Sequence, residues 1–419
     1  MSILGIIAEY NPFHNGHLYH LEQAKSLTGA RYTVCVMSGN FIQRGEPALI
    51  NKWARTKSAI LSGIDLVIEL PVVYSMASAE FFGFGGVKLL DSLGIVDYLC
   101  FGSENGSTVS LDEIAEILLN EPASYREYLK EHLDKGLSFP ASRKSALLKY
   151  LSKMGADTDS LEETMRSSNN ILGIEYLKAL KKLGSTIKPV TIKRIISTYN
   201  SKELAGSIAS ATAVRKNIFD NSRKIDFDAL KKVIPDNSLS ILKEEFECGR
   251  GPVFPCMYET LLLGLARRMR TEDFSSLPYV NEGLENRLKA ASGTSGSIEQ
   301  YLETVCTKRY TRTRIQRILS SILTGLTKNE FDEFNKFGGP QYIRVLGFNS
   351  NGRELLSKIK KSAALPVIVK AADFKNSCNP LLKRMLEIEA SATDIYVLAH
   401  SNTEFKRAGQ EFTQNLIRL

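Results

Sequence analysis

Three of the five histidines in this chain of 419 residues, His14, His17 and His20, lie close together near its start. They follow a short apolar segment and a turn that contains Pro12, and they open a helical pattern. A helix N-terminus offers unpaired N–H groups and the positive end of a dipole, and Gly16 lets the backbone approach a ligand closely. Two imidazoles three residues apart add further donors. The stretch therefore predicts a site for a phosphate whose negative charge grows during a reaction.

Two other interpretations of the histidines compete with phosphate binding. A metal site would need a third ligand, such as a carboxylate, and the HExxH spacing of metalloproteases is absent. A pair such as His17 and His20 can also lie on a helix surface without a role. The preceding strand and the adjoining glycine favour phosphate over both. The six cysteines contain no CxxC pair, so we expect structural thiols and no protein-bound metal.

The segments around the histidines alternate between strand and helix patterns. Four short, almost continuously apolar segments are typical of strands buried on both faces of a parallel sheet: "SILGIIAEY", "TVCVMSG", "DLVIEL" and "DYLCFGS". Each is followed by a helical pattern, which predicts a doubly wound α/β domain. His14 and His17 then lie at the carboxyl edge of the sheet, where ligands bind in such folds.

The rest of the chain is expected to be mainly helical. Helical patterns dominate from residue 111 to 183, and residues 186–195 then predict one returning strand, with Arg194 near its end. A helix should follow behind Ser207 or Ser210. Beyond residue 220 the pattern is almost wholly helical up to a short α/β-like tail. We therefore predict an α/β domain over residues 1–220 and a mainly helical domain over residues 221–419.

The composition is that of an ordinary globular protein with a basic charge balance. Apolar residues make up 43% of the chain, and 54 lysines and arginines exceed 46 acidic residues, for a formal charge of +8. No signal peptide and no membrane-spanning stretch is recognisable, so we expect a cytoplasmic protein. The excess charge suits a polyanionic partner, which makes its distribution along the chain informative.

The basic residues gather in one segment of the second half. Residues 304–329 contain no acidic residue. Five cations surround Tyr310 there: Lys308, Arg309, Arg312, Arg314 and Arg317. A helix through this segment would bury its isoleucines and keep Arg314 and Arg317 on another face. The cluster predicts contact with an RNA backbone, with the tyrosine available for stacking, and the alternative from the charge pattern is a solvated helix face.

The tetrapeptide "HNGH" after a first strand resembles the HxGH signature of the nucleotidyltransferase superfamily, whose members transfer or release a nucleotide by attack on an α-phosphate. The second signature of that superfamily, of the ISSTxxR type, has a looser match in "IASATAVR". Ser210, Thr212 and Arg215 stand in the expected order, and Ala211 replaces a serine. The role of these three matching residues stays open.

Six segments narrow the resemblance to one family. They are "EYNPFHNGHLYH", "MSGNFIQRGEPALINKWART", "FGSE", "NNILGIEYLKAL", "KRYTRTRIQRIL" and "GPQYIRVLGFN". Together they resemble the bacterial tRNA(Met) cytidine acetate ligase family. The resemblance implies a Rossmann-like nucleotidyltransferase domain with a parallel sheet, followed by a mainly α-helical C-terminal domain. It also implies a ligase that activates acetate with ATP as acetyl-adenylate, releases pyrophosphate, and passes acetyl to N4 of the wobble cytidine of elongator tRNA(Met).

The resemblance further implies a set of site residues. The catalytic ones are His14, His17 and Arg194, and the arginine is a permanent cation suited to a triphosphate. Residues implied to bind ATP are Ile7, Ala8, Glu9, Tyr10, Asn11, Pro12, Phe13, His14, Asn15, Gly16, His17, Leu18, Tyr19, His20, Gly102, Asn169, Arg194 and Ile195. Gly102 and Asn169 rest on the resemblance, since a glycine after a strand commonly marks a turn and an asparagine can cap a helix.

Partners follow from the same resemblance. ATP, acetate and tRNA(Met) are the expected substrates, the basic segment is expected to hold the tRNA, and Mg²⁺ is expected to arrive with ATP. Neither a membrane nor DNA is expected as a partner. The chain has neither a Walker A sequence nor the pyrophosphate loop of acetyl-CoA-dependent acetyltransferases, so acetyl-CoA is not the expected donor.

Two other functions stay open on the sequence. A simpler nucleotidyltransferase would make a dinucleotide cofactor or an activated alcohol, with the basic helical domain serving for dimerisation. A non-catalytic RNA-binding protein would keep only a nucleotide pocket. Formation of an acyl-adenylate from ATP and a carboxylate separates the ligase from both alternatives.

Overall fold

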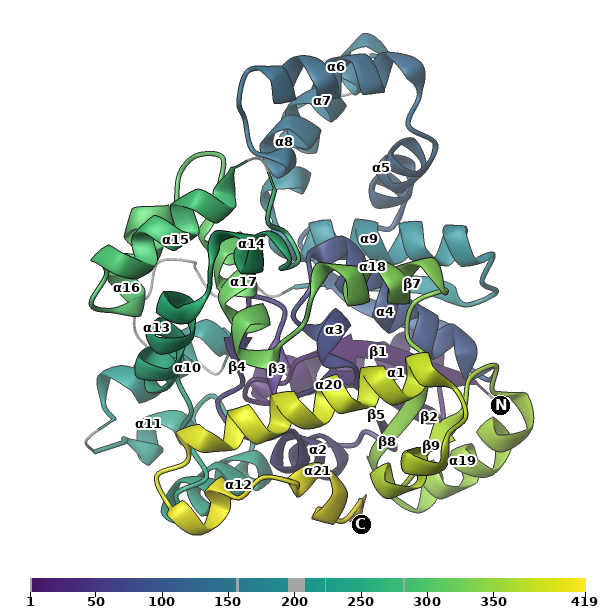
Figure 1. Ribbon diagram of the computed structural model, residues 1–419. Helices are drawn as coiled ribbons and strands as arrows, with labels where there is room; N and C mark the ends of the chain where they lie inside the picture. Colours follow the sequence, from purple (N-terminus) through teal and green to yellow (C-terminus); the bar gives the residue numbers. More distant parts are fainter. Residues whose placement is uncertain (1, 156–157, 195–207, 223, 282) are drawn as a thin grey trace.

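A sheet lies at the centre of the computed structural model, which describes residues 2–155, 158–194, 208–222, 224–281 and 283–419 (Figure 1). Within this described part the strands of the sheet are β1 (Ile3–Ala8), β2 (Tyr32–Ser38), β5 (Leu66–Leu70), β6 (Tyr98–Ser103), β7 (Lys188–Lys193), β8 (Ile343–Phe348), β9 (Val367–Ile368) and β10 (Ile417–Arg418). Their order is β10-β8-β5-β2-β1-β6-β7, with β9 beside β8. A separate antiparallel hairpin, β3 (Phe41–Ile42) and β4 (Glu46–Pro47), follows β2.

The strand order creates a position for a ligand. β2 and β6 both pair with β1 in parallel, one on each side, and β5 and β7 extend the two sides. The direction in which the chain adds strands therefore reverses at β1. In open α/β sheets, ligands bind beyond the carboxyl ends of the strands at such a reversal. The predicted Rossmann-like parallel sheet is confirmed, and the segment after β1 lies at the expected binding position.

Helices surround this sheet on both faces (Figure 1). In the described residues the helices before residue 221 are α1 (Asn15–Thr28), α2 (Lys52–Leu61), α3 (Val72–Ser75), α4 (Ala79–Ser92), α5 (Val109–Asn120), α6 (Ala123–Asp134), α7 (Phe139–Lys153), α8 (Thr158–Arg166), α9 (Ser168–Leu183) and α10 (Ala211–Asp220). Apolar residues of α1 and α2 pack on one face, and those of α4 and α9 on the other. Every residue of β2 and β5 is buried, which explains their continuous apolar sequences.

The later half of the chain is mainly helical, as its pattern predicts. Its described helices are α11 (Phe227–Lys231), α12 (Asp236–Glu247), η1 (Pro255–Tyr258), α13 (Glu259–Arg268), α14 (Thr271–Ser275), α15 (Leu284–Thr294), α16 (Ile298–Val305), α17 (Arg312–Thr324), α18 (Lys328–Lys336), α19 (Ser350–Ser362), η2 (Ala371–Asn376), α20 (Pro380–Tyr396), η3 (Val397–Ala399), η4 (Thr403–Lys406) and α21 (Gln410–Thr413). Helices α5 to α8 project at the top of Figure 1. Among the described helices, none is both long and apolar enough to cross a membrane.

Three strands from the last eighty residues enter the central sheet. β8 pairs antiparallel with β5, and β9 and β10 each pair in parallel with β8. The interpretation of the second half as almost wholly helical up to its tail misses β8, because an apolar run of six residues does not distinguish a strand from a helix. A division of the chain near residue 220 stays a prediction. The sheet itself takes strands from both sides of that point.

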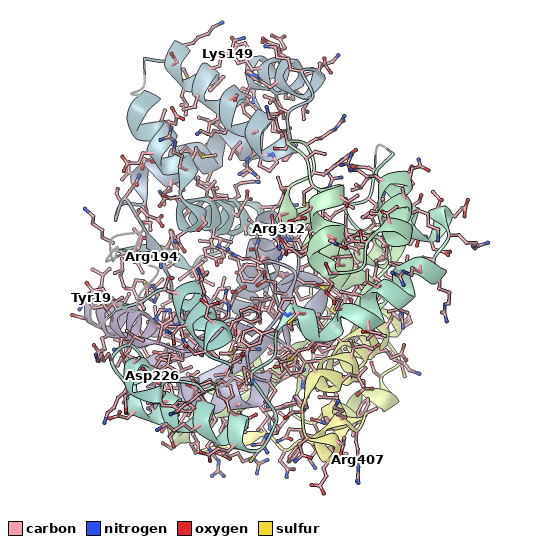
Figure 2. The ribbon with its side chains drawn as sticks, turned by 90° about the vertical axis from the view of Figure 1, so that its left-hand side faces the viewer. Tyr19, Lys149, Arg194, Asp226, Arg312 and Arg407 are labelled. Atoms are coloured by element: carbon pink, nitrogen blue, oxygen red, sulfur yellow. The ribbon has the colours of Figure 1, made fainter. Side chains whose placement is uncertain are left out.

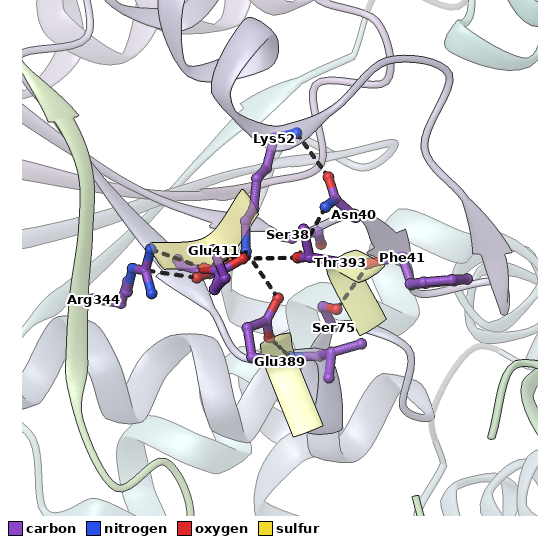
Figure 3. A network of polar contacts seen from close by, with 12 residues as sticks. Ser38, Asn40, Phe41, Lys52, Ser75, Arg344, Glu389, Thr393 and Glu411 are labelled. Carbon is purple, nitrogen blue, oxygen red and sulfur yellow. Dashed lines mark hydrogen bonds and ion pairs between the residues drawn. The ribbon is translucent and has the colours of Figure 1, made fainter. Parts of the chain in front are cut away.

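A buried charge network joins the C-terminal helices to the sheet. The Lys52 Nζ atom of α2 lies 2.6 Å from Glu69 in β5, 3.2 Å from Glu389 in α20 and 2.8 Å from Glu411 in α21. Arg344 of β8 pairs with Glu411 at 2.8 Å. Figure 3 shows Lys52 pointing toward Glu389 and Glu411, with Arg344 on the other side of Glu411. Glu69, which has no recognisable partner in the sequence, thus gains partners from distant segments.

Candidate active site

The HNGH segment follows β1 directly and begins helix α1. His14 is the N-cap residue of α1, with extended backbone angles, and its Nδ1 atom accepts a hydrogen bond from Gly16 N at 3.0 Å. The Nδ1 atom of His17 accepts one from His14 N at 3.3 Å. The two imidazole rings stack, with centroids 3.8 Å apart. These bonds form a reciprocal cap built from two histidines.

The cap determines which nitrogen of each ring carries the proton. A neutral imidazole that accepts through Nδ1 carries its proton on Nε2. Burial, together with the positive charges of Arg194 and Arg215, lowers the pKa of His14 to about 3. Burial also lowers the pKa of His17, with further contributions from His14, His20 and Arg194. Both rings are therefore neutral at pH 7 and present paired Nε2–H donors.

Buried aromatic rings hold this pair in place. Tyr10 and Phe13 contact the ring of His17, with centroid distances of 5.0 and 5.5 Å. Asn11 accepts a hydrogen bond from Leu49 N at 2.7 Å, which fixes the turn against the segment after the β3–β4 hairpin. The loop from β1 to α1 is therefore supported from several sides, as preorganised donors require.

The remaining loop residues implied to bind ATP occupy varied positions. Ile7 packs against Gly86 of α4, where an added Cβ atom would come within 2.8 Å of its side chain. Asn15 donates from its backbone N–H and its side chain to carbonyl oxygens of Val233 and Lys232. Ala8 at the end of β1 and Leu18 and Tyr19 in α1 are partly buried and pack against the same apolar cluster. Pro12 is buried.

Arg194 lies next to the histidines although it is distant in sequence. Its backbone N–H donates to Ser103 O at 2.9 Å, directly after β7. Its side chain lies over Gly102 of β6, where an added Cβ atom would be 3.1 Å from Arg194 Cγ. A larger residue at 102 would crowd the Arg194 side chain. The positive charge of Arg194 lowers the pKa of His20 to about 4, after the larger effect of burial.

The structure thus brings His14, His17, His20, Gly102 and Arg194 to one end of the sheet. Figure 2 shows Arg194 and Tyr19 toward the same side of the molecule. Ile195, the last residue implied to bind ATP, lies outside the described residues.

Asn169 belongs to the same end of the sheet, but it is not a helix cap. Ser167 is the N-cap of α9, and Asn169 lies in the first turn. Its Nδ2 atom donates to Glu104 Oε1 at 2.7 Å, and Glu104 N donates to Asn170 Oδ1 at 3.0 Å. The first turn of α9 and the loop after β6 are therefore joined beside Gly102.

Helix α10 brings the second signature to the first. Ser210 caps the helix and accepts from Ala213 N at 3.1 Å. Arg215 donates from Nη1 to Asn11 O at 2.8 Å, and its Nη2 atom lies 3.5 Å from Thr212 Oγ1. The imperfect motif thus supplies a cation that holds the turn immediately before His14.

Sequence reasoning missed Arg55, which is buried and connects the ends of two strands. Its guanidinium donates to Glu9 O at 2.6 Å after β1, to Ser38 O at 3.0 Å at the end of β2, and to Gly39 O. Nothing in its spacing within α2 distinguishes it from a surface arginine. An arginine in a helix of mixed polar and apolar residues carries no signal until its carbonyl partners are known.

The basic segment is only partly exposed. Arg312 forms a two-bonded ion pair with Glu299 at 2.7 and 2.6 Å and remains exposed at the start of α17. Arg314 donates to Tyr279 O at 3.0 and 2.7 Å. Arg317 donates from Nε to Gln43 O at 2.9 Å, in the β3–β4 hairpin. Lys308 and Arg309 are exposed before α17. Arg314 and Arg317 therefore hold the fold together as well as adding charge.

Known proteins resemble this chain over its whole length. The family model described as HIGH Nucleotidyl Transferase matches residues 1–411. Proteins named tRNA(Met) cytidine acetate ligase from Acetivibrio thermocellus and a Thermoanaerobacter species are 55% and 48% identical, each over 100% of both chains.

Two solved structures show the same fold. They are those of Thermotoga maritima TmcAL, bound with alpha-thio ATP and in an apo form, with TM-scores of 0.93 and 0.95. Each is 38% identical to this chain and covers 100% of both chains. The chain, with its histidine cap at the reversal of a parallel sheet, therefore belongs to the tRNA(Met) cytidine acetate ligase family of HIGH nucleotidyl transferases.

Proposed function

We propose that this protein activates acetate with ATP as acetyl-adenylate and transfers the acetyl group to N4 of the wobble cytidine of elongator tRNA(Met). The observation that carries the proposal is the pair of neutral histidines after the carboxyl end of β1, which feel the positive charge of Arg194, whose side chain lies over Gly102. The names of the full-length relatives supply the carboxylate and the tRNA. A tRNA substrate also implies action in the cytoplasm.

The first step needs donors and positioning more than proton transfer. Acetate is already ionised at neutral pH, so its carboxylate oxygen attacks the α-phosphorus without a base. The bond from that phosphorus to the bridging oxygen breaks, and pyrophosphate leaves with the electron pair. Negative charge grows on the phosphate oxygens, where the His14 and His17 Nε2–H groups and the Arg194 guanidinium would stabilise it.

Mg²⁺ enters the proposal only as a companion of ATP. In the described part of the chain, no group of three or more histidine, cysteine or acidic side chains is arranged to hold a metal ion. When bound with ATP, Mg²⁺ would neutralise phosphate charge.

The second step requires tRNA, and the basic segment is our proposed contact. Lys308, Arg309, Arg312, Arg314 and Arg317 precede or lie in α17, and Arg317 touches the hairpin that follows β2. Phosphate contacts of this kind would orient the anticodon loop toward the active site.

Incubation with labelled ATP tests the proposal. With acetate we expect acetyl-adenylate and pyrophosphate, and with elongator tRNA(Met) added we expect N4-acetylcytidine and AMP. Parallel reactions with formate and propionate, and with tRNA that lacks a wobble cytidine, define the selectivity. Absence of an acyl-adenylate with every carboxylate would contradict the proposal and leave a simpler nucleotidyltransferase.

A further inference from the structure

Glu9 occupies an unusual position directly after β1. Gln43 N donates a hydrogen bond to its Oε1 atom at 2.9 Å. Its Oε2 atom has no hydrogen-bond partner among the described residues, and the side chain is only half-buried. One carboxylate oxygen is thus oriented by the backbone, and the other remains available to a ligand.

Cations surround this carboxylate without pairing with it. Three positive charges favour the ionised form of Glu9: those of Arg215 in α10, Arg55 in α2 and Arg44 in the β3–β4 hairpin. Arg55 and Arg215 give hydrogen bonds to backbone carbonyls instead, at Glu9 O and Asn11 O. In the described part of the chain no cation lies within ion-pair distance of the Glu9 carboxylate. The positive charge of Arg215 also contributes to the lowered pKa of His14. The same cation is therefore near both Glu9 and the histidine cap.

Glu9 lies directly after β1, where the two sides of the sheet meet. Gly102, Asn169 and Arg194 come from β6, α9 and β7, on one side of β1. The residue that orients Glu9 is Gln43, from the hairpin after β2, on the other side. The Glu9 carboxylate therefore receives its orienting hydrogen bond from the side of β1 opposite to these three residues.

Gln43 also links Glu9 to the basic segment. Its backbone N–H donates to Glu9 Oε1, and its backbone oxygen accepts from Arg317 Nε, both at 2.9 Å. An RNA held along α17 would therefore lie next to the hairpin residue that orients the carboxylate.

The two histidines of the cap are not available as bases. Their Nδ1 atoms accept backbone N–H groups, so neither ring has a free nitrogen lone pair. Glu104 is held by Asn169 in the loop after β6, and Glu46 accepts from Gln316 Nε2 at 2.9 Å, whereas Glu9 is held by Gln43, the residue that also accepts from Arg317. We propose that Glu9 is the general base of the acetyl-transfer step, an assignment that rests on the proposed function.

The step balances as follows. The N4 nitrogen of cytidine forms a bond to the carbonyl carbon of acetyl-adenylate, using its lone pair. The bond from that carbon to the phosphate oxygen breaks, and AMP leaves with the electron pair. The nitrogen loses one proton, which the free oxygen of the Glu9 carboxylate accepts. Adenylate formation needs no base, so Glu9 serves only the second step.

The electrostatic surroundings suit this role. Burial raises the pKa of Glu9, while the Gln43 N–H and the positive charges of Arg215, Arg55 and Arg44 oppose that change. The charge of Glu9 also acts on two other titratable groups. It raises the pKa of Tyr176 in α9, after the larger effect of burial, and it opposes the lowering of the Arg317 pKa by burial in α17. A raised pKa makes a carboxylate a stronger base. Transfer should therefore slow as the pH falls through this pKa, because the carboxylate becomes protonated.

The variant Glu9→Gln tests the proposal because glutamine keeps the acceptor for Gln43 N. We expect acetate-dependent ATP–pyrophosphate exchange to fall much less than the transfer step does. Single-turnover transfer from enzyme-bound acetyl-adenylate to tRNA should fall about 10²-fold or more, and its decline at low pH should disappear. Glu9→Asp, which keeps a carboxylate, should restore part of the rate. Glu46→Gln serves as the matched control, because Glu46 is a carboxylate on the β3–β4 hairpin that also contains Gln43. This variant should keep the parental rate and pH profile.

Two results would overturn the assignment. Transfer at the parental rate and pH profile in Glu9→Gln would show that Glu9 only anchors the hairpin. An equal loss of exchange and transfer would place Glu9 with the ATP-binding residues. Failure of the proposed function is distinguishable from both, since the parent protein would then form no acetyl-adenylate or would not acetylate tRNA.

Discussion

His14 performs two tasks with its two ring nitrogens. Its Nδ1 atom caps helix α1 through Gly16 N, and we propose that its Nε2–H group donates to a phosphate of ATP. Replacing the ring with alanine removes the cap and the donor together, so a lost activity would not identify which task matters. Asparagine is a strong N-cap residue and can keep the first task while losing the ring donor.

We therefore expect His14→Asn to fold with near-parental stability and to lose about 10²-fold or more in acetate-dependent ATP–pyrophosphate exchange. His14→Ala should show a similar fall in the exchange rate. It should also lose about 1 kcal/mol of unfolding free energy, because the helix cap is removed. Exchange assays and urea unfolding measure the two effects. Parental exchange in His14→Asn would mean that the residue only caps the helix.

The neutral state of His14 makes stability depend on pH. Its pKa is about 3 in the folded protein, against about 6.5 for an unperturbed histidine. Between these values the unfolded chain binds a proton that the folded chain does not, so stability decreases as the pH falls below about 6.5. The expected contribution is up to about 1.4 kcal/mol per pH unit. Urea unfolding at pH 7.5 and 5.5 should show a smaller loss for His14→Asn than for the parent, and equal losses would refute the buried neutral ring.

Helix α17 shows how one element divides its cations between folding and charge. Arg314 and Arg317 hold carbonyl oxygens of neighbouring segments, whereas Arg312 is exposed and pairs with Glu299. Exposed ion pairs contribute little to stability, so Arg312 can exchange its partner for a phosphate at small cost. The residues that test tRNA binding most cleanly are therefore Lys308, Arg309 and Arg312.

Replacing Lys308, Arg309 and Arg312 together by glutamine should leave ATP–pyrophosphate exchange intact and weaken tRNA binding. Each lost phosphate contact should reduce the slope of log K against log salt concentration by about 0.7 to 0.9. Filter binding at several salt concentrations measures the slope. Arg407→Gln is a control on another exposed part of the molecule (Figure 2). A parental slope in a folded triple variant would place tRNA elsewhere.

The charge network around Lys52 connects the whole molecule to the active site. Its carboxylates lie against Gly39, where an added Cβ atom would be 2.8 Å from Glu389 Oε1 and 3.0 Å from Glu69 Oε1. The same Gly39 offers its carbonyl oxygen to Arg55, which holds Glu9 O. Residues near the C-terminus therefore support the end of β2 and, through Arg55, the start of the histidine loop.

Lys52→Met should destabilise the protein by about 3–5 kcal/mol, because it leaves buried carboxylates without their shared cation. Lys57→Met, one turn further along α2, removes only an exposed pair with Glu244 and should cost less than about 1 kcal/mol. Urea unfolding of the two variants provides the comparison. Similar small losses in both would show that the network contributes little to the fold.

The sequence by itself determined the features that are encoded in consecutive residues. The strand before His14, the start of α1, the alternation of strands and helices, and the strand ending near Arg194 all appear where local pattern predicts them. Apolar runs and turn residues act on their nearest neighbours, so a short window of sequence carries this information.

Only the tertiary structure decided which distant residues meet. Arg194 lies over Gly102, Arg215 holds Asn11, and β8 joins β5 in the opposite direction. Glu69 appears without a partner in the sequence because its partners are Lys52 and Arg344, which share no local pattern with it. Such contacts form where distant segments of the chain pack side by side and where a buried charge is paired with an opposite charge. They depend on how whole elements pack, and no window of neighbouring residues records that packing.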